Sequence, residues 1–220
     1  MSLEDKVGDK ESKGFIKKAA KIGWKLGMAV ATTALSVPLV GTLGVVVGCA
    51  FAVGGLVGNL ARGKSFYDSI DSSLTIYSAV NAIIYPMVWL GDTTFPLINN
   101  ATTGGKLLRG LYASIAYNAA FVGAFRGAGH LVDNYLNPKG IVNSIKKDFW
   151  KDWAVIGAMF SPFYYGAANN IAQLTMYHPW TGYNAAPTFA VGAVPVGFAH
   201  NYWFGKDKQK EIYGRSPDAQ

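Results

Sequence analysis

Residues 26–61 form the longest apolar stretch of the chain, 36 consecutive positions without Asp, Glu, Lys, Arg or His. About 20 residues suffice for one helical crossing of a bilayer, and 36 residues in one helix would extend about 54 Å. The stretch is therefore too long for a single crossing. We expect a helical hairpin or a re-entrant loop with its turn at Val37–Pro38 and 41–44, because Pro interrupts helical hydrogen bonding and Gly accepts unusual dihedrals.

Four further apolar stretches have the length of a bilayer crossing: 72–91 (or 72–98 if the helix continues), 110–133, 153–177 and 183–204. Residues rich in turn formers separate them, at 99–105, 137–140 and 178–182. The pattern predicts an all-α fold, a polytopic membrane helical bundle with four single crossings and an N-terminal apolar hairpin. The predicted organisation is a basic segment (1–25), the hairpin (26–61), a four-span core (71–205) and a tail (206–220).

The composition agrees with a protein embedded in lipid. Half of the residues are hydrophobic and 15% are charged, whereas soluble domains carry about 25% charged residues. The 26 glycines favour close helix packing in a membrane, where small residues let backbones approach. Cys49 is the only cysteine, so no internal disulfide can form, and we expect it to be a small buried residue.

The distribution of Lys and Arg predicts the orientation. Seven lie in the N-terminal tail, two in the connection after the hairpin, two at 99–109, four at 139–151 and four after residue 205. If the hairpin returns to its starting side, 17 lie on one side and 2 on the other. If it crosses once, the sides hold 9 and 10. The positive-inside rule favours the first arrangement, a multi-pass protein of the cell (inner) membrane with both termini cytoplasmic.

The N-terminal segment combines lysines with apolar residues between positions 13 and 25. This spacing is typical of a basic amphipathic helix at the membrane interface, and a solvated linker is the alternative. With a net charge of +7, the expected partner is a bilayer with anionic headgroups, and no nucleic acid is expected.

Three ionisable residues in 110–133 are the first candidates for chemistry. Arg126, His130 and Asp133 are spaced by four and three residues and share one helical face. Arg and Asp can neutralise each other there, and His titrates near neutral pH. Either the three form a proton or substrate relay facing the bundle interior, or they lie near the cytoplasmic end and extend to the headgroups. Further polar candidates, which can line a cavity or only join helices, are Asn81, Asn118, Asn169 and His200, and Pro162 can expose backbone carbonyls.

Sequence motifs for other chemistry are missing. The chain contains no Gly-rich phosphate loop, no His-Glu-x-x-His, no Gly-x-Ser-x-Gly and no Cys/His spacing typical of metal ligands. We therefore predict that the protein is not an enzyme and carries no cofactor or metal.

Short motifs in residues 71–205 resemble a known family. They are Ser78-Ala79-Val80-Asn81 with Ile84 and Gly91; Arg109, Leu111, Asn118, Arg126, Gly129 and Asp133; Pro138-x-Gly140 with Ile145; Ser161-Pro162-Phe163-Tyr164; Trp180; and Gly192-Ala193-Val194 with Gly197-Phe198. Their order and approximate spacing are similar to those of the bacterial L-alanine exporters, small four-span inner-membrane proteins. Residues 1–70 have no counterpart in this resemblance, and His200-Asn201 stand where an acidic residue would be expected.

The resemblance implies an integral membrane transporter that exports L-alanine or a similar small amino acid, driven by the proton gradient. Arg126 would meet the carboxylate, Asp133 or carbonyls near Ser161 and Pro162 the ammonium, and His130 a coupling proton. The alternative is a structural or assembly subunit of a larger membrane complex without transport activity. Because four spans seldom enclose a cavity alone, we also expect a homo-oligomer.

Overall fold

The computed structural model describes residues 3–169, 192–199 and 201–202. All the regular structure in this part of the chain is helical, as predicted. Seven α-helices, a 3₁₀ turn and a π-helical turn have these bounds: α1 Leu3–Val40, α2 Leu43–Ala61, α3 Phe66–Thr94, η1 Phe95–Leu97, α4 Thr103–Tyr112, η2 Ala113–Tyr117, α5 Asn118–Asp133, α6 Ile141–Lys146 and α7 Phe149–Ala168. Residues 192–199 and 201–202 are helical as well.

The apolar stretch 26–61 does reverse direction, at the predicted place. Helix α1 ends at Val40, and α2 begins at Leu43. Gly41 lies between them with a φ of 60°, a left-handed conformation that costs Gly little, and its N–H donates to Val37 O at 2.9 Å. The basic segment 13–25 is helical as expected, but it is continuous with the apolar part of α1 and forms no separate helix.

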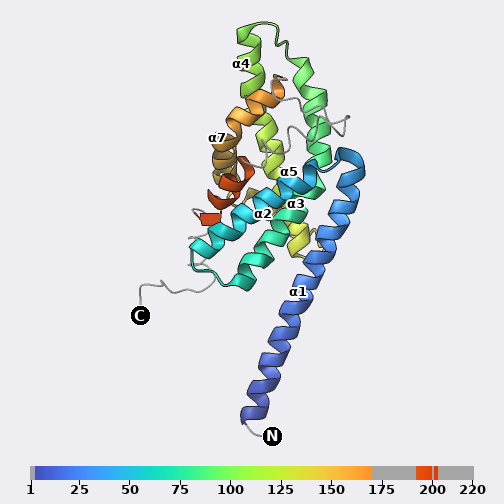
Figure 1. The fold of residues 1–220 in the computed structure, drawn as a ribbon, viewed down its shortest axis with the longest axis vertical. Coiled ribbons are helices and arrows are strands. Elements are labelled where there is room, and N and C mark those ends of the chain that lie inside the picture. Colours follow the sequence, from blue (N-terminus) through green and yellow to red (C-terminus); the bar gives the residue numbers. More distant parts are fainter. Residues whose placement is uncertain (1–2, 170–191, 200, 203–220) are drawn as a thin grey trace.

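Helix α3 packs against both arms of this hairpin and reverses direction again (Figure 1). It begins at Phe66, six residues before the predicted stretch 72–91, because Ser65 accepts a hydrogen bond from Asp68 N at 3.1 Å and caps the helix. Helix α3 continues to Thr94, and η1 extends it to Leu97, so the longer of the two predicted bounds is correct.

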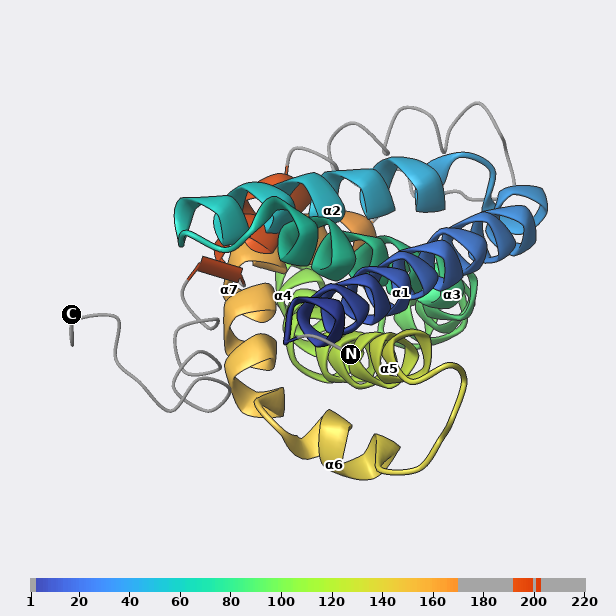
Figure 2. The same cartoon turned by 90° about the horizontal axis from the view of Figure 1, so that it is seen from below.

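The second half of the chain forms a smaller helical layer. Helices α4 and α5 are joined through η2, and the turn at 134–140 ends with Gly140 at a φ of 85°. Helix α6 then connects α5 to α7 at the edge of the bundle (Figure 2). Aromatic rings join the two halves: Phe51 of α2 stacks on Phe160 of α7 and on Phe121 of α5, with centroids 5.5 and 6.4 Å apart.

Three helices in the described part of the chain are long and apolar enough to cross a membrane: Gly14–Val40, Leu43–Ala61 and Phe66–Leu97. They mark the chain as a candidate multi-pass membrane protein. The described parts of the predicted crossings 110–133 and 153–177 form helices through Asp133 and Ala168, which are not among these three. Residues 170–177 of the second of these crossings, and residues 183–191, 200, 203 and 204 of the last predicted crossing, lie outside the described residues.

Helix α2 contacts its neighbours through glycines. A Cβ on Gly54 would lie 2.0 Å from Val194 O, and one on Gly58 would lie 2.7 Å from Phe198 O, so the two backbones touch. In contrast, Gly23 on α1 has open space around it. The expectation that Cys49 is buried was wrong, because its side chain is exposed on α2. Helix α2 packs against its neighbours through the face that carries its buried glycines.

Candidate functional site

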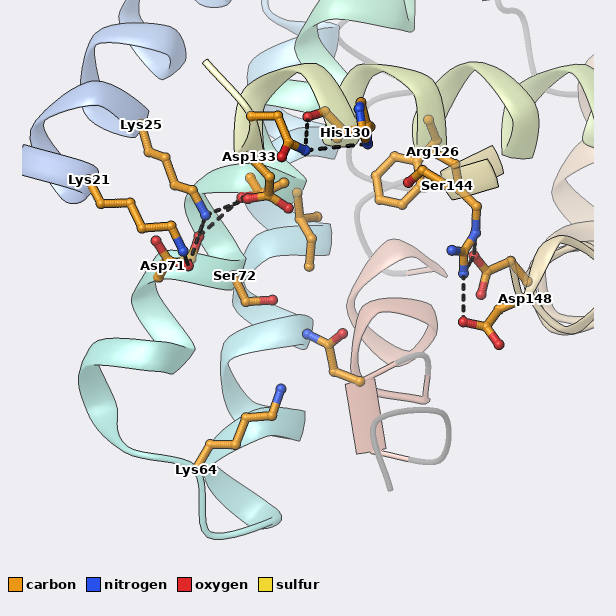
Figure 3. A pocket seen from close by; sticks show the side chains of 17 residues that line it. Lys21, Lys25, Lys64, Asp71, Ser72, Arg126, His130, Asp133, Ser144 and Asp148 are labelled. Atoms are coloured by element: carbon orange, nitrogen blue, oxygen red, sulfur yellow. Dashed lines mark hydrogen bonds and ion pairs between the residues drawn. The ribbon is translucent and has the colours of Figure 1, made fainter. Parts of the chain in front are cut away.

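A polar pocket of about 530 Å³ lies where α1, α3, α5 and the beginning of α7 meet (Figure 3). Lys64 of the α2–α3 connection lines the pocket, so the pocket lies toward that end of the bundle. The η1–α4 connection is at the opposite end in Figure 1. Its lining is unusually rich in charged groups for an apolar chain: Lys21, Lys25, Lys64, Asp71, Arg126, His130, Asp133, Asp148 and Asp152.

Lys25 is at the centre of the first charge cluster. Its side chain is 1% exposed, and its Nζ lies 2.9 Å from Asp71 Oδ2 and 2.6 Å from Asp133 Oδ1. It also donates to the backbone carbonyl of Asp71 at 3.0 Å. A buried ammonium is tolerated only when it is paired in this way. Lys25 of α1 thereby joins the first turns of α3 to the last turn of α5.

Two neighbours complete this cluster. Lys21 Nζ donates to Asp71 Oδ2 at 2.7 Å, and Thr75 Oγ1 donates to Asp133 Oδ1 at 2.8 Å. Asp71 Oδ1 is buried and has no hydrogen-bond partner among the described residues. Leaving such an acceptor unpaired costs free energy, so Asp71 presents a site for a further donor.

Arg126 forms the second cluster, between α5 and α7. Its Nε and Nη2 both contact Oδ2 of Asp152, whose side chain is fully buried, and Nη2 lies 3.9 Å from Asp148 Oδ2. Such charge-assisted pairs are stronger than neutral hydrogen bonds. Arg126 is itself 14% exposed and points toward the pocket (Figure 3).

His130 lies between the two clusters at the more exposed side of the pocket. Its Nε2 is 3.1 Å from Lys139 O, and its Nδ1 is 3.3 Å from Asn134 Nδ2. No group of three or more His, Cys, Asp or Glu side chains in the described residues is placed to hold a metal ion.

The formal charges of the pocket balance. Four cations, from three Lys and Arg126, face four carboxylates when His130 is neutral. They form two ion-paired clusters on opposite sides, with Lys21 and Lys25 beside Asp71 and Asp133, and Arg126 beside Asp148 and Asp152 (Figure 3). A net-neutral pocket with an ion-paired cluster on each side offers partners of both signs, which suits a dipolar or zwitterionic solute.

The structure brings together the three residues that the sequence singled out on one helical face. Arg126, His130 and Asp133 all line the pocket. Their partners are not those expected: Arg126 pairs with Asp152, and Asp133 pairs with Lys25. The reason is that a spacing of seven residues places Arg126 and Asp133 about 10 Å apart along α5. Charged groups from other helices lie closer to each of them and form the ion pairs.

Asn81 lies away from the pocket, where α1, α2 and α3 meet. Its Oδ1 accepts from Ser36 Oγ at 3.0 Å, and its Nδ2 donates to Tyr77 O at 3.0 Å. Its amide packs so closely on α2 that Cβ atoms on Gly44 and Gly48 would lie 2.9 and 2.6 Å from it. Asn81 therefore joins helices, which was one of its two predicted roles.

Asn118 and Ser161 lie together on the interface of η2 and α7. Ser161 Oγ is 3.0 Å from Ser114 Oγ, and Asn118 donates from Nδ2 to Trp153 O at 2.8 Å. Pro162 is inside α7 with an exposed side chain. Asn169 donates to Lys106 O at 3.0 Å at the opposite end of the bundle. None of these four residues lines the pocket, and His200 lies outside the described residues.

Several pocket residues were not among the sequence candidates: Lys21, Lys25, Asp71, Asp148 and Asp152. The two lysines resemble ordinary interfacial residues in the sequence. A usable signal was present in the carboxylates, since Asp71 and Asp152 each directly precede a predicted crossing, at 72–91 and 153–177. Carboxylates at this depth need cationic partners from other helices.

Comparison of the chain with models of protein families, with curated proteins and with solved structures finds no match. The proposals that follow therefore rest on the site and the residue pattern.

Proposed function

We propose that this protein is an integral membrane transporter that binds a small zwitterionic amino acid in the charged pocket. The observation that carries the proposal is the balanced set of charges, in two ion-paired clusters on opposite sides of a cavity of about 530 Å³. A pocket that served only one sign of charge would not need four cations and four carboxylates. L-Alanine is the first solute to test, on the sequence resemblance described above, with export driven by the proton gradient.

The two charged groups of an amino acid have separate partners in this arrangement. Asp71 Oδ1 is a buried acceptor without a partner among the described residues, which suits an ammonium. Arg126 binds Asp152 through Nε and Nη2, and a guanidinium carries further donors that suit a carboxylate. His130, at the exposed side of the pocket, is the candidate for a coupling proton.

Transport in proteoliposomes tests this proposal. Uptake and efflux of labelled L-alanine are measured with and without a pH gradient, and lactate and ethylamine serve as competitors that carry only one of the two charges. We expect L-alanine transport that responds to the gradient and weak competition by either analogue. Failure of the wild-type protein to bind or transport any small amino acid would contradict the proposal.

Arg126→Gln and Asp71→Asn are the informative variants. Each removes one charged contact, so affinity should fall about 10- to 100-fold, the effect of losing one hydrogen bond to a charged group. Lys106→Gln is the matched control, because Lys106 is exposed on α4 at the other end of the bundle. Unchanged transport by Arg126→Gln at normal expression would remove Arg126 from the mechanism.

A structural or assembly subunit is the second candidate function. It is favoured by the face of α1 that no described helix covers, where Leu26, Val30 and Leu35 are 50%, 70% and 69% exposed. Such a face contacts either lipid or another protein. Purification in mild detergent separates the two: a stoichiometric partner of a different sequence, with no solute binding, would favour the structural role.

A further inference from the structure

The helix that carries Arg126 is interrupted by a π-helical turn. Residues Ala113–Tyr117 form η2 between α4 and α5, and the N–H of Asn118 bonds to Ala113 O, five residues back. A π turn holds one residue more than an α turn, is rare, and occurs frequently at functional sites. It needs specific contacts to persist in place of a continuous α-helix.

Helix α7 supplies those contacts through Trp153. The indole Nε1 donates to Ile115 O in η2 at 3.0 Å, and Asn118 Nδ2 donates back to Trp153 O at 2.8 Å. Asn118 is fully buried, and its Oδ1 accepts from Tyr164 OH at 3.1 Å. A Cβ on Gly157 would lie 2.7 Å from Asn118 Nδ2, so α7 has no room for a side chain at this position beside the amide. We call these contacts the Trp153 latch.

The extra residue sets the rotation of α5 relative to α4. One residue corresponds to about 100° around a helix, so conversion of η2 to an α turn would turn α5 by about that angle if α4 stayed in place. Helix α4 is anchored independently, because Arg109 donates to Ile98 O at 2.8 Å and to Ala168 O at 3.0 Å. The rotation would carry Arg126 and Asp133 away from the pocket.

The latch and the pocket are also linked directly. Trp153, which binds η2, follows Asp152, which binds Arg126, so consecutive residues of α7 hold α5 at two places. With η2 in its π-helical form both contacts form together, whereas a rotation of α5 would separate Arg126 from Asp152. Releasing one of them therefore weakens the other.

We propose that the Trp153 latch makes η2 a conformational switch, in which a π-to-α conversion rotates α5 and separates Arg126 from Asp152. This inference rests on the proposed function, for which it provides the second state of the solute pocket. A transporter requires two states of its site, and a helix with two discrete registers has them. A solute that binds the pocket charges of one state would shift the population toward that state.

Disulfide cross-linking between α5 and α3 tests the switch without any solute. A Cβ on Gly129 lies 3.7 Å from Thr75 Cγ2, so Gly129→Cys with Thr75→Cys, in a Cys49→Ser background, reports the rotation of α5. Trp153→Phe keeps the ring but removes the donor to Ile115. Trp89→Phe is the control, because Trp89 is 54% exposed on α3, outside η2 and α7.

We expect Trp153→Phe to shift the π-to-α equilibrium constant about fivefold toward the α form, the effect of losing one hydrogen bond, and therefore to cross-link more slowly than the parent. Trp89→Phe should cross-link at the parental rate. Deletion of Ala116, which is exposed in η2, removes the extra residue and should slow the reaction at least as much.

Trp153→Phe and the deletion variant are first shown to elute as a single folded species. Cross-linking of Trp153→Phe or of the deletion variant at the parental rate would overturn the switch. Because no solute is present, that result leaves the zwitterion proposal intact, and absence of amino-acid binding leaves the switch intact.

Discussion

Single residues with unusual burial define the polar end of this molecule. Lys25 is the clearest case, since an ammonium with 1% exposure contacts two carboxylates from different helices. The long side chain lets α1 bring a charge from the edge of an apolar helix to the interior of the bundle. The pairs hold α1, α3 and α5 together, although the desolvation of the charges offsets much of the attraction.

Replacing Lys25 by Met should lower stability by about 2–4 kcal/mol, because Asp71 and Asp133 lose the buried cation that they share, although Asp71 keeps Lys21 at 2.7 Å. The value is below that of a fully buried pair because Asp133 is 48% exposed and regains water. Thermal unfolding in detergent micelles measures the loss. Lys17→Met, at an exposed position of the same helix, is the control and should change the midpoint little. Equal effects of the two substitutions would show that the Lys25 pairs do not stabilise the bundle.

At the scale of elements, the helices of this protein meet through small residues. Helix α2 places Gly44 and Gly48 against Asn81 of α3, and Gly54 and Gly58 against the backbone of 192–199. Spacings of four residues put each pair on one face, and the missing side chains let the backbones touch. The Gly-x-x-x-Gly pattern alone does not predict such contacts. Gly23 and Gly27 show the same spacing, but a Cβ added to either would meet no described atom within 4 Å.

Alanine substitutions at two of these glycines should have opposite effects. Gly54→Ala would place a methyl group 2.0 Å from Val194 O, and the helices must separate at a cost of about 1–3 kcal/mol. Gly23→Ala meets nothing within 4 Å and should add about 1 kcal/mol through helix propensity. The thermal midpoints of the two variants in the same detergent give the comparison. A midpoint for Gly54→Ala at or above that of the parent would refute the close contact of α2 with 192–199.

For the whole molecule, the distribution of charge and the position of the pocket agree. The α1–α2 turn and the α2–α3 connection lie at opposite ends of α2. The second of these carries Arg62 and Lys64, and the pocket lies at the same end. The positive-inside rule predicts that this end faces the cytoplasm, so the proposed transporter would hold its solute site open toward the cell interior.

Single cysteines in a Cys49→Ser background test this topology. Cysteines placed at Ser2 and Ser216 should react with an impermeant maleimide only after the cytoplasmic side is made accessible, and one at Thr102 should react from the outside. Thr102 caps α4 at the other end of the bundle. Labelling of the two chain termini from opposite sides would contradict the hairpin topology.

The local pattern of the chain was enough to predict the helices and several of their limits. The uncharged stretch 26–61 required a turn, and Gly41 provides it because a left-handed φ costs glycine little. The spacing of Arg126, His130 and Asp133 placed them on one face of α5, and they do share one pocket. Periodicity and turn chemistry depend on residues that are close together in the chain, so the sequence alone is enough to predict them.

The charge pairing and the helix register were decided only by the tertiary structure. Asp71 and Asp152 reach Lys25 and Arg126 from helices that are 26 to 46 residues distant in the chain, and no local rule selects among so many charges. The π turn at 113–117 likewise accepts a hydrogen bond from Trp153, 38 residues after Ile115. The packed bundle determines which partner comes within bonding distance of each buried charge, and an unpaired buried polar group is costly because it loses its hydrogen bonds to water.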